Sequence, residues 1–482
     1  MAVTHLPTST GADVTAAAER ARELQVEWAN RPVADRAAVL LRFHDRLLDR
    51  VDPFVDMLQR EAGKARLSAT EEVLHCALTA RYYARRADRY LRSERGHGVY
   101  PLLTRIDRHY LPKGLIGIIA PWNYPLTMAI SDGLAALVAG NAVIAKPAEQ
   151  TPMVCLGAVE LLEQCGMPPG LWQVVHGPGD VVGPQLIDVS DYVCFTGSTA
   201  TGRVVAARCA DRLIGCSLEL GGKNPMLVLA DADVEAAAEG AVRACFSNGG
   251  QLCVSVERIY VHQSVMEDFC RAFVARTQAL RLGSAFDYDH DIGSLISRDH
   301  VQRVREQVDD AQARGARILT GGRQRRDLGE LFYDPTVLTG VTPEMACYAE
   351  ETFGPVVSVY SVSSDDEAVA RANDSRYGLN ASVWTGDPGH GRQVARQIKC
   401  GSVNVNEGFA ATFGSIDAPM GGMKHSGLGR RQGRDGIRRF VEVQSVATQR
   451  GLPIAPSHGL SGRQFASAII AALRVLRTLR RP

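Results

Sequence analysis

Residues 115–147 read LIGIIAPWNYPLTMAISDGLAALVAGNAVIAKP, and this stretch decides the class of fold. Its first six residues, LIGIIA, form a continuous apolar run with the length of a strand that is buried on both faces. Residues 126–140 then place apolar side chains at helical spacing, and residues 141–147 return to a short apolar run. A strand, a helix and a second strand in this order predict a βαβ unit with parallel strands.

The same alternation of strands and helices continues toward the C-terminus. Further strands are predicted at residues 172–177, 191–197, 216–222, 224–230 and 258–262, with helices at 154–166, 180–187, 200–210 and 233–250. Residues 12–95, before the βαβ unit, are helical in pattern. The sequence therefore predicts two doubly wound α/β domains that join near Gly221 and Gly222.

Length and composition indicate an ordinary globular protein of about two to four domains. The chain has 482 residues and a net charge of +1, so no global field favours nucleic acid or acidic partners. The sequence predicts neither a signal peptide nor a membrane-spanning segment. The eleven cysteines lack C-x-x-C and zinc-type spacings, which indicates free thiols in a reducing compartment, the cytoplasm, and no metal site.

One cysteine stands in an unusual setting. Residues 246–255 read FSNGGQLCVS, so Gly249 and Gly250 come shortly before Cys253. Glycines let the backbone approach a ligand closely and free its N–H groups to face an oxyanion. A nucleophilic thiolate has use for both features, whereas most free cysteines are small buried apolar residues. Both interpretations of Cys253 remain open on this motif alone.

Two further side chains lie at predicted strand ends, where ligands bind in doubly wound sheets. Glu219 precedes two glycines, and a desolvated carboxylate there has a raised pKa and acts as a base. Asn123 lies between Pro121 and Pro125 and offers a neutral donor for a developing oxyanion. The alternatives are a helix cap or surface charge for Glu219 and a proline-rich turn for Asn123.

A nucleotide site is indicated by two other strand ends. Lys146 and Glu149 follow the strand at 141–147, where they are placed to contact phosphate or ribose hydroxyls. Residues 195–202, FTGSTATG, give a strand, a turn and a helix start with glycines and hydroxyls, as suits a phosphate. The pattern is not G-x-G-x-x-G, so alone it is a weak signal.

Together these stretches resemble the aldehyde dehydrogenase superfamily, from about residue 12 to about residue 447. Seven motifs stand in the family's order: PWNYP at 121–125, KPAEQTP at 146–152, FTGSTATG at 195–202, LELGGKNP at 218–225, NGGQLC at 248–253, EETFGPV at 350–356 and PMGGMKHSGLGR at 419–430. The resemblance implies two doubly wound α/β domains with a small β oligomerisation extension. It also implies oxidation of an aldehyde to a carboxylic acid with NAD, or alternatively NADP.

The resemblance assigns roles to individual residues. It makes Cys253 the nucleophile that forms a thiohemiacetal and then a thioester, Glu219 the base that activates water, and Asn123 the oxyanion donor beside the Cys253 N–H. The residues it assigns to the cofactor are Trp122, Lys146, Glu149, Ser198, Glu351 and Phe353. Glu149 argues for NAD, because its charge would repel the 2′-phosphate of NADP.

The closest likeness is to bacterial succinate-semialdehyde dehydrogenases. Better-known members hold the substrate carboxylate with two arginines, and this chain has Ser131 and Ser247 in their places. A serine that also contacts the carboxylate is matched by Ser415, and Arg243 is a candidate substitute for the missing charge. We therefore expect succinate semialdehyde as the substrate, with a neutral aliphatic or aromatic aldehyde as the alternative.

The resemblance also divides the chain into parts. Residues 1–93 and 113–220 are expected to form a dinucleotide-binding domain, and residues 221–425 a catalytic domain. Residues 94–112 and 426–450 match oligomerisation segments, which implies a homodimer or homotetramer. Residues 451–482 form a basic tail with no acidic residue after Glu442, and we favour a packing or interface role over contact with an anionic membrane.

Two functions of another class remain as alternatives. A cysteine hydrolase or acyltransferase needs a histidine base, and His176 and His425 are the only histidines near glycine turns. A non-catalytic scaffold docked to a membrane by its tail has no need of Cys253, Glu219 and Asn123 together.

Overall fold

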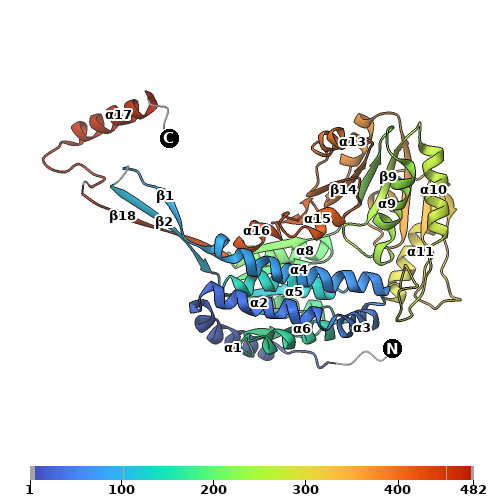
Figure 1. The fold of residues 1–482 in the computed structure, drawn as a ribbon, viewed down its shortest axis with the longest axis horizontal. Coiled ribbons are helices and arrows are strands. Elements are labelled where there is room, and N and C mark those ends of the chain that lie inside the picture. The colour runs from blue at the N-terminus through green and yellow to red at the C-terminus, as the bar shows by residue number, and fades with distance from the viewer. Residues whose placement is uncertain (1–5, 101–102, 452, 479–482) are drawn as a thin grey trace. The chain divides into compact units, whose positions relative to one another are not determined.

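The computed structural model describes residues 6–100, 103–451 and 453–478 (Figure 1). The chain divides into two compact units. Unit 1 comprises Met1–Tyr90 and Pro112–Phe440, and unit 2 comprises Leu91–Leu111 and Val441–Pro482.

Unit 1 begins with four helices, as the pattern of residues 12–95 predicts: α1 (Gly11–Asn30), α2 (Val33–Leu48), α3 (Val51–Ala62) and α4 (Arg66–Leu91). Helix α1 starts with a capping box, in which Thr10 and Asp13 bond to each other's backbone N–H groups. The buried Trp28 at the end of α1 donates its indole N–H to the Leu137 carbonyl at 2.8 Å. This bond ties the N-terminal helices to the following α/β layer.

The first sheet contains six strands in the order β17-β7-β6-β3-β4-β5. Its parallel strands are β3 (Leu115–Ile119), β4 (Ala142–Lys146), β5 (Trp172–Val174), β6 (Tyr192–Thr196) and β7 (Gly215–Glu219), connected by α5 (Pro125–Val138), α6 (Met153–Gln164), α7 (Gly179–Val189) and α8 (Thr199–Asp211). The predicted βαβ unit is therefore confirmed as β3-α5-β4. Strand β17 (Gly427–Leu428) pairs antiparallel with β7 at the edge, opposite Glu219 and Leu218.

The second sheet contains seven strands in the order β10-β11-β12-β9-β8-β14-β15. The strands are β8 (Asn224–Val228), β9 (Val256–His262), β10 (Arg317–Thr320), β11 (Thr336–Thr339), β12 (Val356–Val362), β14 (Asn380–Trp384) and β15 (Ser402–Val405). All pairs are parallel except β10 with β11. The accompanying helices are η1 (Ser247–Gly250), α9 (Val234–Phe246), α10 (Met266–Gln278), α11 (Arg298–Ala313), α12 (Ala346–Ala349), α13 (Asp365–Asn373), α14 (Pro388–Ala395) and α15 (Ala410–Gly414).

Both faces of this second sheet are covered. On β12, Val357 and Val359 join a core cluster with Phe269 and Phe273 of α10, while Tyr360 on the opposite face joins the cluster of α11. Alternate side chains of one strand thus enter two separate cores, which is why its sequence is apolar at nearly every position. The two doubly wound sheets confirm the predicted class of fold.

The remaining elements of unit 1 come late in the chain. Strand β13 (Tyr377–Gly378) pairs with β16 (Met423–Lys424), and α16 (Gly433–Arg438) follows β17. The predicted oligomerisation segment 426–450 is therefore divided between the two units. Its first part, through Phe440, belongs to unit 1, because β17 extends the six-stranded sheet.

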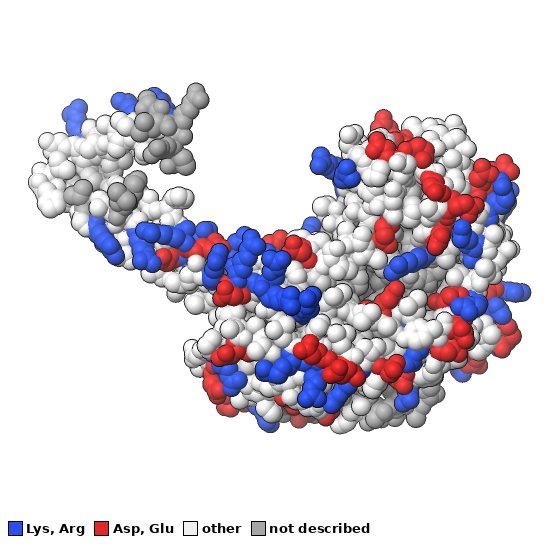
Figure 2. All heavy atoms as spheres, in the orientation of Figure 1, with Lys and Arg blue, Asp and Glu red and all other residues white. Residues whose placement is uncertain are grey.

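Unit 2 contains a three-stranded sheet and a helix. The strand order is β1 (Glu94–His97), β2 (Thr104–Pro112) and β18 (Val441–Gln449), and β1 is antiparallel to β2. Helix α17 (Gly462–Thr478) carries arginines and no acidic residue, and Figure 2 shows no red atoms there. Within the described residues, no helix is long and apolar enough to cross a membrane.

Candidate active site

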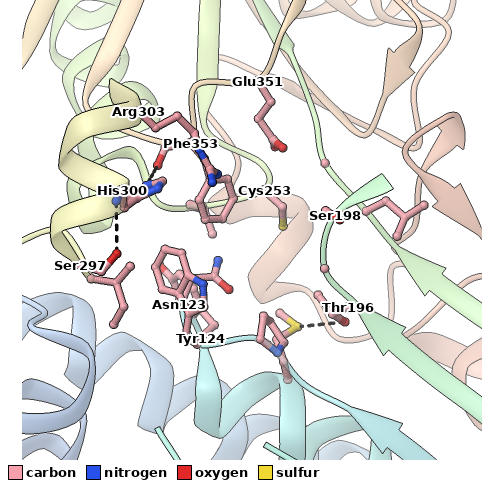
Figure 3. A pocket seen from close by; sticks show the side chains of 18 of the residues that line it. Asn123, Tyr124, Thr196, Ser198, Cys253, Ser297, His300, Arg303, Glu351 and Phe353 are labelled. Atoms are coloured by element: carbon pink, nitrogen blue, oxygen red, sulfur yellow. Dashed lines mark hydrogen bonds between the residues drawn. The ribbon is translucent and has the colours of Figure 1, made fainter. Parts of the chain in front are cut away.

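A cavity of about 400 Å³ opens in unit 1 where the ends of several strands meet. Its wall includes Trp122 and Asn123 after β3, Ser198 after β6, Cys253 before β9, and Glu351 to Phe353 before β12 (Figure 3). Crevices at the carboxyl ends of parallel strands are where doubly wound sheets bind their ligands. The cavity therefore brings together residues from six of the seven sequence motifs.

The loop before Cys253 has a backbone conformation that explains its glycines. Asn248, Gly249 and Gly250 have φ values of 52°, 64° and 72°, in the left-handed region. A Cβ atom on Gly250 would lie 2.1 Å from the Gly354 carbonyl oxygen. The glycines therefore allow the loop before Cys253 to pack closely against the backbone at Gly354. The sequence predicted a close approach of the backbone to a ligand, and the structure shows a close approach between two backbone segments.

Gln251 holds this loop in place. Its side-chain oxygen accepts from the Ile296 N–H at 2.9 Å, and its amide nitrogen donates to the carbonyls of Asn248 and Ser294. The amide of Asn123 in turn donates to the Gln251 carbonyl at 3.0 Å. Asn123 and the cysteine loop are thus fixed relative to each other by hydrogen bonds.

The Cys253 thiol lines the cavity, and the carboxyl groups of Glu219 and Glu351 affect its ionisation. Burial, followed by the charges of Glu219 and Glu351, raises the pKa of Cys253 to about 12. The resting thiol is therefore neutral, and a positive charge close to the sulfur is needed to stabilise the thiolate.

Glu219 ends strand β7 just behind the cavity wall, which is formed there by Leu220 and Gly221. The residue is 5% exposed, and neither carboxyl oxygen has a hydrogen-bond partner within the part of the chain that the structure describes. Burial raises its pKa to about 7. A carboxyl group with this pKa exchanges protons near neutral pH, as a general base requires.

Four of the six predicted cofactor residues line the cavity: Trp122, Ser198, Glu351 and Phe353. The Trp122 ring meets Phe353 edge-on at 5.6 Å between centroids, so two nearly perpendicular aromatic rings line this part of the cavity. Ser198 caps α8 and accepts from the Thr201 N–H at 3.1 Å. The Glu351 carboxylate accepts from the Gly222 N–H at 2.7 Å, and burial raises its pKa to about 8.

The other two predicted cofactor residues lie outside this wall. Lys146 is buried at the end of β4 and donates to the neighbouring Pro147 carbonyl at 3.2 Å, and burial lowers its pKa. Glu149 is exposed on the loop that follows. Gln150, the next residue, does line the cavity, so this loop adjoins the site.

The predicted substrate contacts are also absent from the cavity wall. Arg243 forms an ion pair with Glu71 at 3.2 Å on the surface, with 53% of its side chain exposed. Ser415 is exposed after α15. Ser131 is buried on α5, and Ser247 donates its hydroxyl to the Arg243 carbonyl at 2.7 Å.

Sequence reasoning missed Glu257, which supports the cofactor side of the cavity. This carboxylate on β9 accepts from the N–H groups of Thr352 and Phe353 at 2.9 and 3.0 Å and pairs with Lys223 at 2.5 Å. The available signal was a charged residue inside the apolar run 256–262. His300 was missed too, and its Nε2 lies 2.7 Å from the Phe353 carbonyl.

Two doubly wound sheets that share a cavity lined by a cysteine, an amide and a carboxyl group are the fold and site of an aldehyde dehydrogenase. The family model described as "Aldehyde dehydrogenase family" matches residues 1–446 of this chain. The chain belongs to the aldehyde dehydrogenase family.

Individual relatives agree with this assignment. A Mycolicibacterium smegmatis protein named "Putative succinate-semialdehyde dehydrogenase (NADP(+))" is 50% identical over 99% of this chain and 92% of its own length. The 2-aminomuconic semialdehyde dehydrogenase of Danio rerio is 36% identical over 92% of each chain. The crystal structure of succinate-semialdehyde dehydrogenase from Burkholderia pseudomallei has a TM-score of 0.88 and 34% identity, over 92% of this chain and 91% of that one.

Proposed function

We propose that this aldehyde dehydrogenase oxidises succinate semialdehyde to succinate with a nicotinamide dinucleotide. The observation that carries the reaction is the position of Cys253 in the cavity, tied to Asn123 through Gln251 and adjacent to the buried Glu219. A cysteine hydrolase would need a histidine base at the thiol. His176 and His425 are not among the residues that line the cavity, and His300, which does line it, has its Nε2 2.7 Å from the Phe353 carbonyl.

We expect the dinucleotide to contact the residues around Glu351 and Ser198 in the cavity wall. A Cβ atom on Gly221 would lie 2.3 Å from a Glu351 carboxyl oxygen, so only glycine leaves room for this carboxylate against the backbone. Trp122 and Phe353 offer two nearly perpendicular aromatic rings, and Ser198 at the N-terminus of α8 lines the cavity. We expect Glu351 to exchange the Gly222 N–H for ribose hydroxyls.

The chain's own residues then carry out the steps of an acyl transfer. The Cys253 thiolate adds to the aldehyde carbon, and the Asn123 amide and the Cys253 N–H donate to the oxyanion of the thiohemiacetal. When bound, the oxidised nicotinamide supplies a positively charged ring that accepts the hydride. The loss of hydride from the former aldehyde carbon leaves a thioester on Cys253.

Hydrolysis of the thioester falls to Glu219. Its carboxylate takes a proton from a water molecule, the hydroxide adds to the thioester carbon, and the thiolate of Cys253 departs as the carboxylic acid forms. Because the pKa of Glu219 is raised to about 7, this step accelerates as the pH rises through neutrality.

Succinate semialdehyde is supported by the names of close relatives and by the motifs of the chain. A neutral aldehyde is the second candidate, and one observation favours it. Arg243, the candidate partner of the substrate carboxylate, is already paired with Glu71. Ser415 remains the proposed second contact.

For the nucleotide, the relatives' names point to NADP, whereas Glu149 favours NAD. Its exposed position allows the carboxylate to repel a 2′-phosphate or to turn away from it. We propose NAD as the preferred cofactor and NADP as a weaker one. We further propose a cytoplasmic homodimer or homotetramer assembled through the strands of unit 2, whose edges would otherwise stay open.

The test is a panel of succinate semialdehyde and neutral aliphatic and aromatic aldehydes, each with NAD and NADP, followed by the absorbance of reduced nicotinamide. We expect the highest kcat/KM for succinate semialdehyde with NAD. Cys253→Ala should abolish turnover and leave NAD binding measurable by calorimetry. An active Cys253→Ala variant, or no reduction with any aldehyde, would contradict the proposal.

A matched pair of substrates tests the role of Arg243. If the Arg243 guanidinium leaves Glu71 to bind the substrate carboxylate, Arg243→Gln should raise KM for succinate semialdehyde about tenfold. KM for butanal, which has the same chain length and no carboxylate, should stay unchanged. Equal KM values for succinate semialdehyde in both proteins would assign the specificity to other residues.

A further inference from the structure

Three buried charged side chains lie beside strand β7, where Arg439 donates to the Ser217 hydroxyl at 2.9 Å, two residues before Glu219. They are Asp132 on α5, Arg431 just before α16, and Arg439 just after it. The same Asp132 carboxyl oxygen accepts from Arg439 Nη2 at 2.6 Å and from Arg431 Nη2 at 3.2 Å. The exposed fraction of each side chain is 8% or less.

This cluster does not balance its own charge. Guanidinium groups stay protonated inside proteins, so Arg431 and Arg439 contribute two positive charges against one negative charge on Asp132. An uncompensated buried charge costs free energy, and the structure offers a carboxyl group nearby that is buried without a hydrogen-bond partner, that of Glu219. The Nε atoms of both arginines are also buried and without partners among the described residues.

The other charged or titratable groups around Glu219 do not supply the missing negative charge. His75 on α4 faces Arg431, and burial and that guanidinium lower the pKa of His75 to about 3, so it is neutral. Arg430 adds a further positive charge, but it is partly exposed and donates to the Gly422 and Gly429 carbonyls. The Cys253 thiol is neutral in the resting protein.

We propose that Arg431, together with Arg439 and Asp132, provides the countercharge for the ionised Glu219 carboxylate and thereby fixes the pH above which the thioester is hydrolysed. Arg431 is then a positioning residue that acts through Glu219. This inference rests on the proposed function, because Glu219 must be the group that activates water.

The proposal predicts pH shifts of opposite sign for two variants of one cluster. Arg431→Gln removes a positive charge, so ionised Glu219 loses stabilisation and the rising limb of the kcat profile moves to higher pH. Asp132→Asn removes a negative charge, so the limb moves to lower pH. A shift of about one pH unit in each direction is expected, equivalent to about a tenfold change in the ionised fraction on the limb.

Further variants separate charge from packing. Arg431→Lys keeps the charge, so its limb should stay near that of the wild type even if its stability falls. Arg208→Gln removes an exposed guanidinium that pairs with Asp188 on the surface, and it should leave the limb unchanged. If Arg431→Gln does not fold, the comparison of Asp132→Asn with Arg431→Lys still tests the sign.

A second measurement does not depend on turnover. The infrared band of the Glu219 carboxyl group, assigned by its loss in Glu219→Gln, should titrate with the same opposite shifts. If no aldehyde is oxidised but the band titrates at higher pH in Arg431→Gln and at lower pH in Asp132→Asn, the proposed function is wrong and the countercharge role of Arg431 is supported. Shifts of the same sign, or none, in Arg431→Gln and Asp132→Asn would overturn the inference.

Discussion

Glu219 is a buried carboxyl group whose ionisation opposes folding. Its pKa in the folded chain is raised to about 7, above the value of 4.5 for a free side chain. Between these two values the folded state binds the extra proton, so stability is greatest below about pH 4.5 and falls as the pH rises toward 7. The raised pKa thus costs stability near neutral pH, where the base role proposed for Glu219 needs the carboxyl group to exchange protons.

We expect Glu219→Gln to remove this pH dependence. The free energy of unfolding of the variant, relative to the wild type, should rise by about 3 kcal/mol between pH 4.5 and pH 8. Denaturant unfolding at the two pH values measures the change. The same variant should accumulate the thioester as added mass on Cys253. A constant stability difference across this range would show that the carboxyl group titrates normally.

At the residue scale, sequence patterns and family likeness pointed to Cys253, Asn123 and Glu219, because each stands in a short motif: Asn123 and Glu219 at strand ends, and Cys253 in the loop before β9. They could not locate Arg431 or Asp132, because the role proposed for these residues depends on an ion pair between segments that are distant in the chain. The same holds for Arg243, whose pairing with Glu71 is visible only in three dimensions. Roles that depend on local sequence are predictable, and pairings between remote segments are not.

At the scale of elements, Glu257 connects strand β9 to the loop before β12. It binds two backbone N–H groups of that loop and the buried Lys223, so one carboxylate positions the segment that carries Glu351 and Phe353. Both partners of the ion pair are almost fully buried, and losing one leaves the other uncompensated.

Glu257→Gln should therefore lower the free energy of unfolding by about 3–5 kcal/mol and weaken nucleotide binding. Chemical denaturation and NAD titration calorimetry provide the two measurements. Arg276→Gln, which breaks an exposed pair with Glu235, is the matched control and should cost less than about 1 kcal/mol. Nucleotide affinity unchanged in Glu257→Gln would mean that the loop holds its position without this carboxylate.

Five strands of the first sheet and two of the second, β8 and β9, were predicted, since each is a short apolar run. The other five strands of the second sheet were not predicted. The two-residue strand β17 was not predicted either, because it is too short for a periodic signal and is defined only by its pairing with β7. That pairing also places residues 427–428 in the first sheet, within the segment 426–450 that the resemblance assigns to oligomerisation. Residues 463–482 are helical in period, and the structure forms α17 over Gly462–Thr478.

At the scale of the whole molecule, the residues that line the cavity all belong to unit 1. The side chains of α17 are largely exposed, including Leu473 at 59% and Val475 at 57%. None of the residues that line the cavity comes from the described part of the tail, 451 and 453–478.

Deletion of residues 451–482 should leave kcat, NAD affinity and the pH profile within about twofold of the full chain, because no part of the reaction site is removed. Steady-state kinetics measure this directly. Deletion from Val441 onward is the contrasting variant, since it also removes β18 and leaves the β2 edge open to aggregation. A large loss of kcat in the shorter deletion would show that the tail supports the active form.

The pairing of β17 with β7 has a consequence for how the chain matures during translation. The strand that ends in Glu219 leaves the ribosome about 200 residues before the strand that completes its sheet, so its outer edge stays unpaired while those residues are synthesised. A nascent chain arrested before Gly427 would therefore be a target for chaperones, and the base would acquire its final surroundings only as the last segment emerges.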